Sequence, residues 1–262
     1  MGLQIYSLAS GSRGNSVLLS DGRTAVLIDL GLSARELSRR LGVAGLVPGD
    51  IECVICTHEH IDHSRGIKDF CNATGRSVHI HADGAPALSA FCKIGLNEIK
   101  SFASASFEVG SMQITAVRVS HDSSCCTGFS VTAGGKKVAY FTDLGIVNEG
   151  VFEAVRGADL LFAEANHDVD MLMSGRYPYS LKRRILSPSG HLSNDACAEL
   201  ALFAVKNGTR KVMLGHLSEN NNLPELAFSA VSGKLARERY SEGSDYILHI
   251  AQQHAPSGWI DV

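Results

Sequence analysis

The chain has 262 residues, of which 45% are hydrophobic, and this supplies enough apolar side chain for one domain with a large core. Its 24 Lys and Arg residues against 27 Asp and Glu residues give a net charge of −3, which excludes a general attraction to polyanions, so a nucleic-acid partner would need a local basic patch. The N-terminal residues lack the pattern of a secretory signal, and no apolar segment approaches the roughly 18 residues of a membrane span, so we expect a cytoplasmic protein with no membrane partner.

The first part of the chain has the pattern of short strands. Strands are expected where β-rich runs are separated by turns, over residues 3–9, 16–20, 24–30, 51–56 and 78–81. Ser33 and Glu36 form a capping box that opens a helix ending near Gly42, and a second helix is expected over 65–73. The histidine-rich segment after residue 56 is expected to be a loop. The seven cysteines are an odd number and are expected to be reduced.

The second part of the chain alternates strands with helices. Strands are expected over 113–120, 128–133, 136–141, 159–163 and 211–214, and helices over 194–206 and 224–240. Gly134 and Gly135 separate two of these strands and predict a two-residue hairpin. A β-rich half followed by a half with both helices and strands favours two sheets with helices on the outside.

One short segment carries the strongest chemical signal. His58, His60, Asp62 and His63 fall within six residues, directly after the strand over 51–56. Imidazole and carboxylate groups are ligands suited to Zn, Mn, Fe or Co. In a loop, the first two side chains can point to one side while the other two turn to the opposite side. The alternative is a polar surface loop that happens to be rich in histidine.

Three further residues of the same types follow predicted strands. His121, Asp143 and His216 each come at or just after the end of a strand. Side chains at strand ends share one edge of a sheet, where loops converge on a rigid scaffold. Together with the first segment they provide five histidines and two aspartates, which is enough for two metal ions with positions left open for water.

The intact motif HxHxDH at 58–63, with the later residues in the right order, resembles the metallo-β-lactamase fold superfamily over most of the chain. The resemblance implies an α/β fold, a four-layer αββα sandwich, with residues 1–262 as a single domain. It also implies two divalent metal ions, Zn or Mn, one held by His58, His60 and His121, the other by Asp62, His63 and His216, with Asp143 bridging them.

Two such ions would explain hydrolytic chemistry. Cations roughly 3.5–4 Å apart stabilise both the attacking and the leaving oxygen of a displacement. Asp62 is expected to act as a catalytic residue by accepting the proton of the attacking water. The lactamases that resemble this fold have Cys at the bridging position, whereas this chain has Asp143, which favours the branches of the family that are not lactamases.

Further segments narrow the substrate. The loop SGSRGNS at 10–16 can turn backbone N–H groups and Asn15 toward an anion, or it can be a plain tight turn. With EANHD at 164–168, YPYSLKRRI at 177–185 and GHLSN at 190–194, it resembles the YycJ/WalJ-like subfamily, whose members resemble DNA-processing exonucleases. This resemblance implies nucleic acid as the partner, DNA rather than RNA, and a 5′–3′ exonuclease activity.

The same segments also resemble ribonuclease Z. By that resemblance Glu164 would orient His191, which would stabilise the scissile phosphate or protonate the leaving oxygen. The chain has Asn166 where ribonuclease Z has Thr, which puts the Glu164 pairing in doubt. Four further residues are predicted to bind substrate, namely Ser12, Asn15, Lys182 and Arg184.

Other functions stay open at this point. The alternative enzyme is a small-molecule hydrolase of the same fold, such as a lactonase or a cyclic-nucleotide phosphodiesterase, and a third class is a metal-binding regulator without activity. The basic run 182–184 favours nucleic acid, although such a run can also be a solvated helix face. His167 can line the site or serve a structural role.

Overall fold

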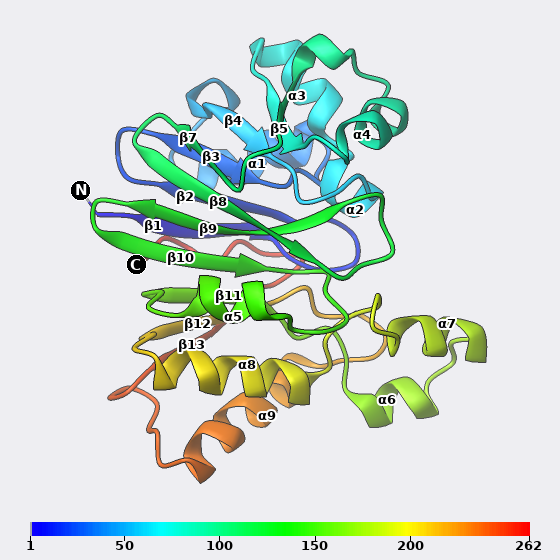
Figure 1. Ribbon diagram of the computed structural model, residues 1–262, viewed down its shortest axis with the longest axis vertical. Coiled ribbons are helices and arrows are strands. Elements are labelled where there is room, and N and C mark those ends of the chain that lie inside the picture. Colours follow the sequence, from blue (N-terminus) through cyan, green and yellow to red (C-terminus); the bar gives the residue numbers. More distant parts are fainter. Residues whose placement is uncertain (1) are drawn as a thin grey trace.

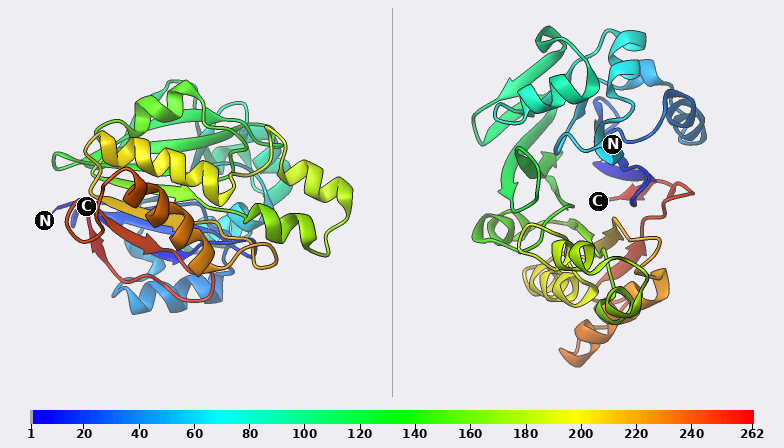
Figure 2. Two further views of the ribbon diagram at one scale, coloured as in Figure 1. Left: turned by 90° about the horizontal axis from the view of Figure 1, so that it is seen from below. Right: turned by 90° about the vertical axis from the view of Figure 1, so that its right-hand side faces the viewer.

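The structure is a computed structural model that describes residues 2–262, so Met1, the first residue of the predicted domain, lies outside the described residues. Two seven-stranded sheets face each other, and helices cover the outer face of each sheet (Figures 1 and 2). The predicted four-layer αββα sandwich is confirmed. Within residues 2–262 no helix combines the length and the apolar character that crossing a membrane requires.

The first sheet has the strand order β14-β1-β2-β3-β4-β5-β6. Its strands are β1 (Gln4–Ala9), β2 (Ser16–Ser20), β3 (Ala25–Ile28), β4 (Cys53–Ile55), β5 (Val78–His81), β6 (Ile99–Phe102) and β14 (Ile260–Asp261). Pairing is antiparallel from β14 to β3 and parallel from β3 to β6. The helices of this half are α1 (Ala34–Val43), α2 (Ile61–Ser64), α3 (Ile67–Thr74) and α4 (Ala85–Cys92), with single 3-10 turns at Pro48–Asp50 and Leu96–Glu98.

The second sheet has the order β13-β12-β11-β10-β9-β8-β7. Its strands are β7 (Ser106–Val109), β8 (Met112–Val119), β9 (Cys126–Ala133), β10 (Lys136–Phe141), β11 (Leu160–Glu164), β12 (Lys211–Gly215) and β13 (Ile247–Ile250). Its helices are α5 (Glu149–Val155), α8 (Asn194–Lys206) and α9 (Pro224–Arg237), while α6 (Val169–Ser174) and α7 (Tyr179–Ile185) project to the right of the sandwich in Figure 1.

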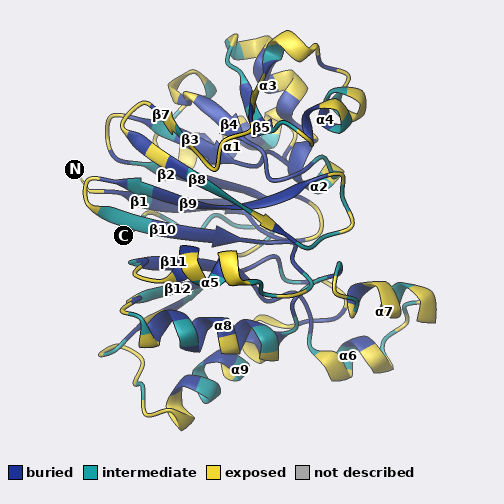
Figure 3. Cartoon of the chain, viewed as in Figure 1, coloured by how far each residue is buried: buried dark blue, intermediate teal, exposed yellow. Residues whose placement is uncertain are grey.

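Alternating side chains divide the core into three layers, because successive residues of a strand point to opposite faces. In β10, Val138 and Tyr140 pack between the two sheets, whereas Ala139 and Phe141 pack against the helices α5, α8 and α9. A third cluster lies between the first sheet and α1, α3 and α4. The central strands are accordingly buried, whereas β7 and β8 at the edge of the second sheet are partly exposed and the outer helix faces are exposed (Figure 3).

The histidine-rich segment is only partly the loop that was predicted. Residues 57–60 are irregular, but Ile61–Ser64 forms the helical turn α2, so Asp62 and His63 lie on a helix. The turn is stabilised because Ser64 Oγ donates to the carbonyl oxygens of Glu59 and His60 at 2.8 and 2.9 Å. Such hydrogen bonds from a side chain to the nearby backbone do not depend on hydrophobic periodicity, so the periodicity of the sequence did not predict this turn.

Candidate active site

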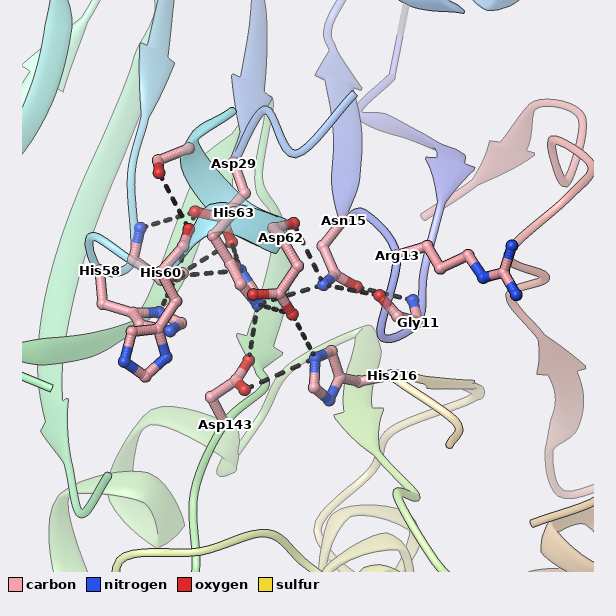
Figure 4. A network of polar contacts seen from close by, with 12 residues as sticks. Gly11, Arg13, Asn15, Asp29, His58, His60, Asp62, His63, Asp143 and His216 are labelled. Atoms are coloured by element: carbon pink, nitrogen blue, oxygen red, sulfur yellow. Dashed lines mark hydrogen bonds and ion pairs between the residues drawn. The ribbon is translucent and has the colours of Figure 1, made fainter. Parts of the chain in front are cut away.

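A cavity of about 230 Å³ opens where loops from both sheets meet. Its lining includes His60, Asp62, His121, Asp143, His191 and His216. The strand β4 leads into the segment that carries His60 and Asp62, β10 leads to Asp143, and β12 leads to His216. The structure brings the predicted ligands together as expected, and Figure 4 shows all of them except His121.

His58, His60 and His121 form the first group of predicted ligands. Each offers a ring nitrogen, and these nitrogens lie within 4.8 Å of one another. The ring centroid of His58 is 4.5 Å from that of His60 and 5.1 Å from that of His121. This spacing lets three imidazoles converge on one ion.

Asp62, His63 and His216 form the second group, and their ligand atoms also lie within 4.8 Å of one another. Asp62 Oδ2 is 3.5 Å from His63 Nε2 and 3.6 Å from His216 Nε2. Asp143 lies between the groups, since Oδ2 is 3.1 Å from His63 Nε2 and Oδ1 is 3.5 Å from His216 Nε2 and 3.7 Å from His121 Nε2. Its carboxylate is positioned to be shared by two ions.

Four of the proposed ligand histidines are held through the Nδ1 atom, so that Nε2 is the nitrogen turned away from this partner. The partners of Nδ1 are Thr57 Oγ1 for His58 at 2.9 Å, Asp29 Oδ2 for His63 at 2.8 Å, the Gly190 carbonyl for His121 at 3.2 Å, and Glu164 Oε1 for His216 at 2.9 Å. Such partners fix the tautomer and the orientation of a metal-binding imidazole. Histidines held in this way could bind a metal ion through Nε2.

Asp29 is the residue of this set that the sequence analysis missed. It is fully buried, and its Oδ1 accepts from Thr57 N at 2.7 Å while Oδ2 binds His63. Burial raises the pKa of Asp29, although the neighbouring His63 opposes that effect. The available signal was a carboxylate inside the apolar run 24–30, because an aspartate is almost never buried without a partner.

The chemistry of the donor set fits divalent cations. Among residues 2–262, the Nε2 atoms of His58 and His216 are buried without a hydrogen-bond partner. Burial lowers the pKa of His216, but Asp143, Asp62 and Glu164 outweigh it and raise the value to about 10. The surroundings therefore favour positive charge, and buried polar atoms that lack protein partners need a ligand to satisfy them.

The backbone is strained at three of these positions. Asp29, Asp143 and His216 have φ angles of 61°, 57° and 54°, in the left-handed region that residues other than glycine rarely adopt. Such strain costs on the order of 1–3 kcal/mol for each residue and persists where the surrounding structure enforces it, commonly at functional sites.

Glu164 connects the second group to His191. Its Oε1 is 2.6 Å from His191 Nδ1 and 2.9 Å from His216 Nδ1, and its Oε2 accepts from the backbone N–H groups of Leu144 and Leu192. Burial opposes the charged form of Glu164, but the two histidines outweigh it and lower its pKa to about 2. The predicted contact with His191 is present, and the additional contact with His216 was not anticipated.

The four predicted substrate-binding residues fall into two pairs. Ser12 and Arg184 line the cavity, where Arg184 also pairs with Asp122. Asn15 is fully buried. Its Oδ1 accepts from Gly11 N, and its Nδ2 lies 3.1 Å from His63 Nε2. Lys182 is 9% exposed, and its Nζ donates to the carbonyls of Met173 and Gly175.

This placement corrects the expectation for Asn15 and Lys182. Both side chains are committed to hydrogen bonds inside the protein, so they shape loops at the site and do not face a substrate. His167 is also buried, and it forms an isolated β-bridge with Ser193 outside the cavity lining.

Comparisons with known proteins agree with this geometry. The family model described as a β-lactamase superfamily domain matches residues 24–217. A protein from Streptococcus pneumoniae named exodeoxyribonuclease WalJ is 34% identical over 255 residues, which cover 95% of this chain and 94% of that protein. A protein from Bacillus anthracis named exodeoxyribonuclease YycJ is 30% identical over 266 residues and covers 98% of both chains.

Solved structures show the same fold. The metallo-β-lactamase fold protein YhfI from Bacillus subtilis superposes with a TM-score of 0.70 at 17% identity, over 98% of this chain and 99% of that chain. The family match, the two relatives and the His and Asp clusters point to one assignment. The chain belongs to the metallo-β-lactamase fold superfamily, in its YycJ/WalJ-like branch, and is a metal-dependent hydrolase.

Proposed function

We propose that this hydrolase cleaves phosphodiester bonds in nucleic acid and that it is a DNA exonuclease acting in the 5′–3′ direction. The observation that carries the proposal is the Glu164–His191 pair, which lies beside the two groups of proposed metal ligands. His191 Nδ1 is 3.6 Å from Asp143 Oδ1. The relatives named exodeoxyribonuclease support the choice of DNA.

The metal ligands in this proposal are those already described. One Zn or Mn ion would be held by His58, His60 and His121 and a second by Asp62, His63 and His216, and Asp143 would contribute to both sites. When bound, two such ions supply an activated water and neutralise charge on the attacking and leaving oxygens.

His191 contributes a positively charged donor. Its Nδ1 is held by Glu164, so Nε2 is free to donate toward the cavity that His191 lines. Burial lowers the pKa of His191, but Glu164 and Asp143 outweigh it and raise the value above the ordinary one. The imidazolium can therefore donate to a phosphate oxygen or give its proton to the leaving oxygen.

Asp62 and Arg184 have separate tasks. The Asp62 side chain is 21% exposed, compared with 3% for Asp143, so it is the carboxylate that can take a proton from the attacking water and pass it to solvent. Arg184 and Ser12 provide a cation and a hydroxyl for the substrate phosphate. Because the net charge is −3, this local cation matters more than the overall charge.

We place this activity in the cytoplasm. Within residues 2–262 the seven cysteines are free, as expected in a reducing compartment.

The test uses protein reconstituted with Zn or Mn and incubated with DNA and RNA, single- and double-stranded, labelled at the 5′ or the 3′ end. A 5′–3′ DNA exonuclease releases a labelled mononucleotide at once from 5′-labelled DNA and gives a shortening ladder from 3′-labelled DNA. Asp143→Ala protein purified by the same procedure is the control, because any activity that it retains comes from contaminating nucleases. Intact nucleic acid, with hydrolysis of a lactone or a cyclic nucleotide, would instead establish the small-molecule alternative.

A further inference from the structure

One wall of the cavity is apolar and aromatic. Tyr177, which lies just before α7, and Leu181 and Ile185 on α7 are here called the α7 wall, and they line the same cavity as His60, Asp143 and His191. Leu181, Arg184 and Ile185 are spaced three and four apart on α7, so they share one face of that helix. A metal-binding floor beside an apolar wall suits a ligand with an anionic end and a flat apolar end.

The α7 wall is held firmly in place. Lys182 Nζ donates to the carbonyls of Met173 and Gly175 at 2.6 and 2.7 Å, and this ties α7 to the end of α6. Tyr177 Oη accepts from Asn220 Nδ2 at 3.0 Å. His191 N donates to the Ile185 carbonyl at 3.0 Å, so the end of α7 is joined directly to the histidine that lies beside the metal ligands.

The close approach of these segments depends on a glycine. A Cβ added to Gly190 would lie 2.1 Å from the Ile185 carbonyl oxygen and 2.4 Å from that of Arg184. The chain therefore packs the His191 loop directly onto the end of α7. A ligand that touches the α7 wall is in a fixed position relative to His191.

We propose that the α7 wall is a subsite for one unpaired nucleobase, the base of the nucleotide whose phosphate lies at the metal site, and that Tyr177 stacks on it. The inference rests on the proposed function and extends it to the nucleobase. Tyr177 is half-buried and lines the cavity, so a base in the cavity lies within reach of its side chain. Aromatic stacking of this kind is a general means of holding unpaired bases.

The small size of the cavity favours an unpaired base. Its volume of about 230 Å³ is below the roughly 300–1,000 Å³ of ordinary ligand pockets, and this small size favours a single base over a base pair. Because every base has a π face, the subsite accepts all four bases with little preference.

The test is a calorimetric titration of Zn-loaded protein with two probes. Thymidine 5′-monophosphate carries a base, whereas 1,2-dideoxyribose 5-phosphate has the sugar and the phosphate alone. The variants are Tyr177→Leu, which removes the ring, Tyr177→Phe, which keeps it, and Tyr179→Leu. Tyr179 is a matched control, since it is a tyrosine only two residues away at the start of α7, is 69% exposed and lies outside the cavity lining.

The unaltered protein should bind the nucleotide more tightly than the abasic probe by roughly 5- to 150-fold, the range expected for one base–aromatic stack. Tyr177→Leu should remove that difference and leave the affinity for the abasic probe unchanged. Tyr177→Phe and Tyr179→Leu should retain the difference.

Equal affinity of the unaltered protein for both probes would overturn the subsite and leave the proposed phosphodiesterase standing. The same conclusion follows if Tyr177→Leu keeps the preference, or if Tyr179→Leu loses it to the same extent. Failure to bind either probe would instead contradict the proposed function itself. Thermal melting of each variant, expected to match the unaltered protein, establishes that a lost preference does not reflect unfolding.

Discussion

Glu164 is a single buried carboxylate that serves two histidines with different tasks. It orients His216, a proposed metal ligand, and His191, which we assign to the substrate. Removing the carboxylate should therefore affect metal binding and chemistry together, whereas removing the His191 ring should affect chemistry alone. The two variants separate these roles.

His191→Ala is expected to lower kcat by about 10²–10⁴-fold, the usual contribution of a positioned acid or base. Metal content should remain near two ions for each chain, because His191 lies outside both proposed ligand groups. Kinetics on DNA and elemental analysis of the same sample measure the two quantities. A large fall in melting temperature with normal specific activity in the folded fraction would show that His191 is only a structural loop residue.

Asp29→Asn tests the orientation of His63. The carboxylate accepts from Thr57 N and holds His63 Nδ1, so the amide should disturb the tautomer that presents Nε2 to the metal. Loss of such a partner typically weakens metal affinity by about 10–100-fold. Competition with a chelator measures the affinity, and Asp159→Asn, which alters an ion pair with Lys136, is the control. Unchanged affinity in Asp29→Asn would contradict the role of Asp29.

At the scale of elements, the connection after β3 supports the ligand turn α2. A Cβ on Gly31 would lie 1.8 Å from the Asp62 carbonyl oxygen, and Asn15 N donates to that same oxygen at 2.7 Å. Gly31→Ala should force these backbones apart and lower the free energy of unfolding by about 1–3 kcal/mol, as overpacking does.

The control for Gly31 is Gly42→Ala. Gly42 lies within α1, and a Cβ added to it would have no neighbour within 4 Å, so alanine should raise the free energy of unfolding by up to about 1 kcal/mol. Denaturant unfolding measures both variants. Equal stability of the two variants would show that the connection yields without strain.

The helix α7 carries three cationic side chains in different environments. Arg184 lines the cavity, whereas Lys182 is buried in hydrogen bonds to α6 and its following residue. Arg184→Gln should therefore flatten the log–log salt dependence of DNA binding by about 0.9 on duplex or about 0.7 on single strands. Arg183→Gln, an exposed neighbour outside the cavity lining, should leave the slope unchanged. Cleavage-resistant phosphorothioate DNA serves for the measurement, and an unchanged slope in Arg184→Gln would remove Arg184 from the substrate path.

The same elements show what the sequence could predict. The strands that lead to His58, Asp143 and His216 are buried on both faces, so each is a nearly continuous run of apolar residues. The ends of these strands could therefore be predicted from the sequence. The helices α4 to α7 have at most eight residues, which is too short for a 3.6-residue pattern to stand out.

Burial of individual polar residues could not be predicted. Lys182 in a basic run resembles a solvated or phosphate-binding cation, and only the fold shows that two carbonyls surround it. Asp29 was absorbed into a predicted strand, although it is the partner of His63. In both cases a contact with a residue distant in the chain or in another element decides the role, and local pattern carries no information about it.

For the whole molecule, the proposed metal site joins the two halves of the sandwich. His58, Asp62 and His63 follow a strand of the first sheet, whereas His121, Asp143 and His216 follow strands of the second. Metal binding is therefore coupled to the packing of the two sheets, and ions that bind only the folded chain stabilise it by mass action.

The number of metal ions tests this account most directly. Elemental analysis of protein saturated with Zn or Mn and freed of excess metal should give close to two ions for each chain, because the ligands form two groups around Asp143. Asp143→Ala should lose metal from both positions, since its carboxylate is shared. About one ion for each saturated chain would contradict the dinuclear site, and an Asp143→Ala chain that keeps one ion at normal affinity would contradict the bridge.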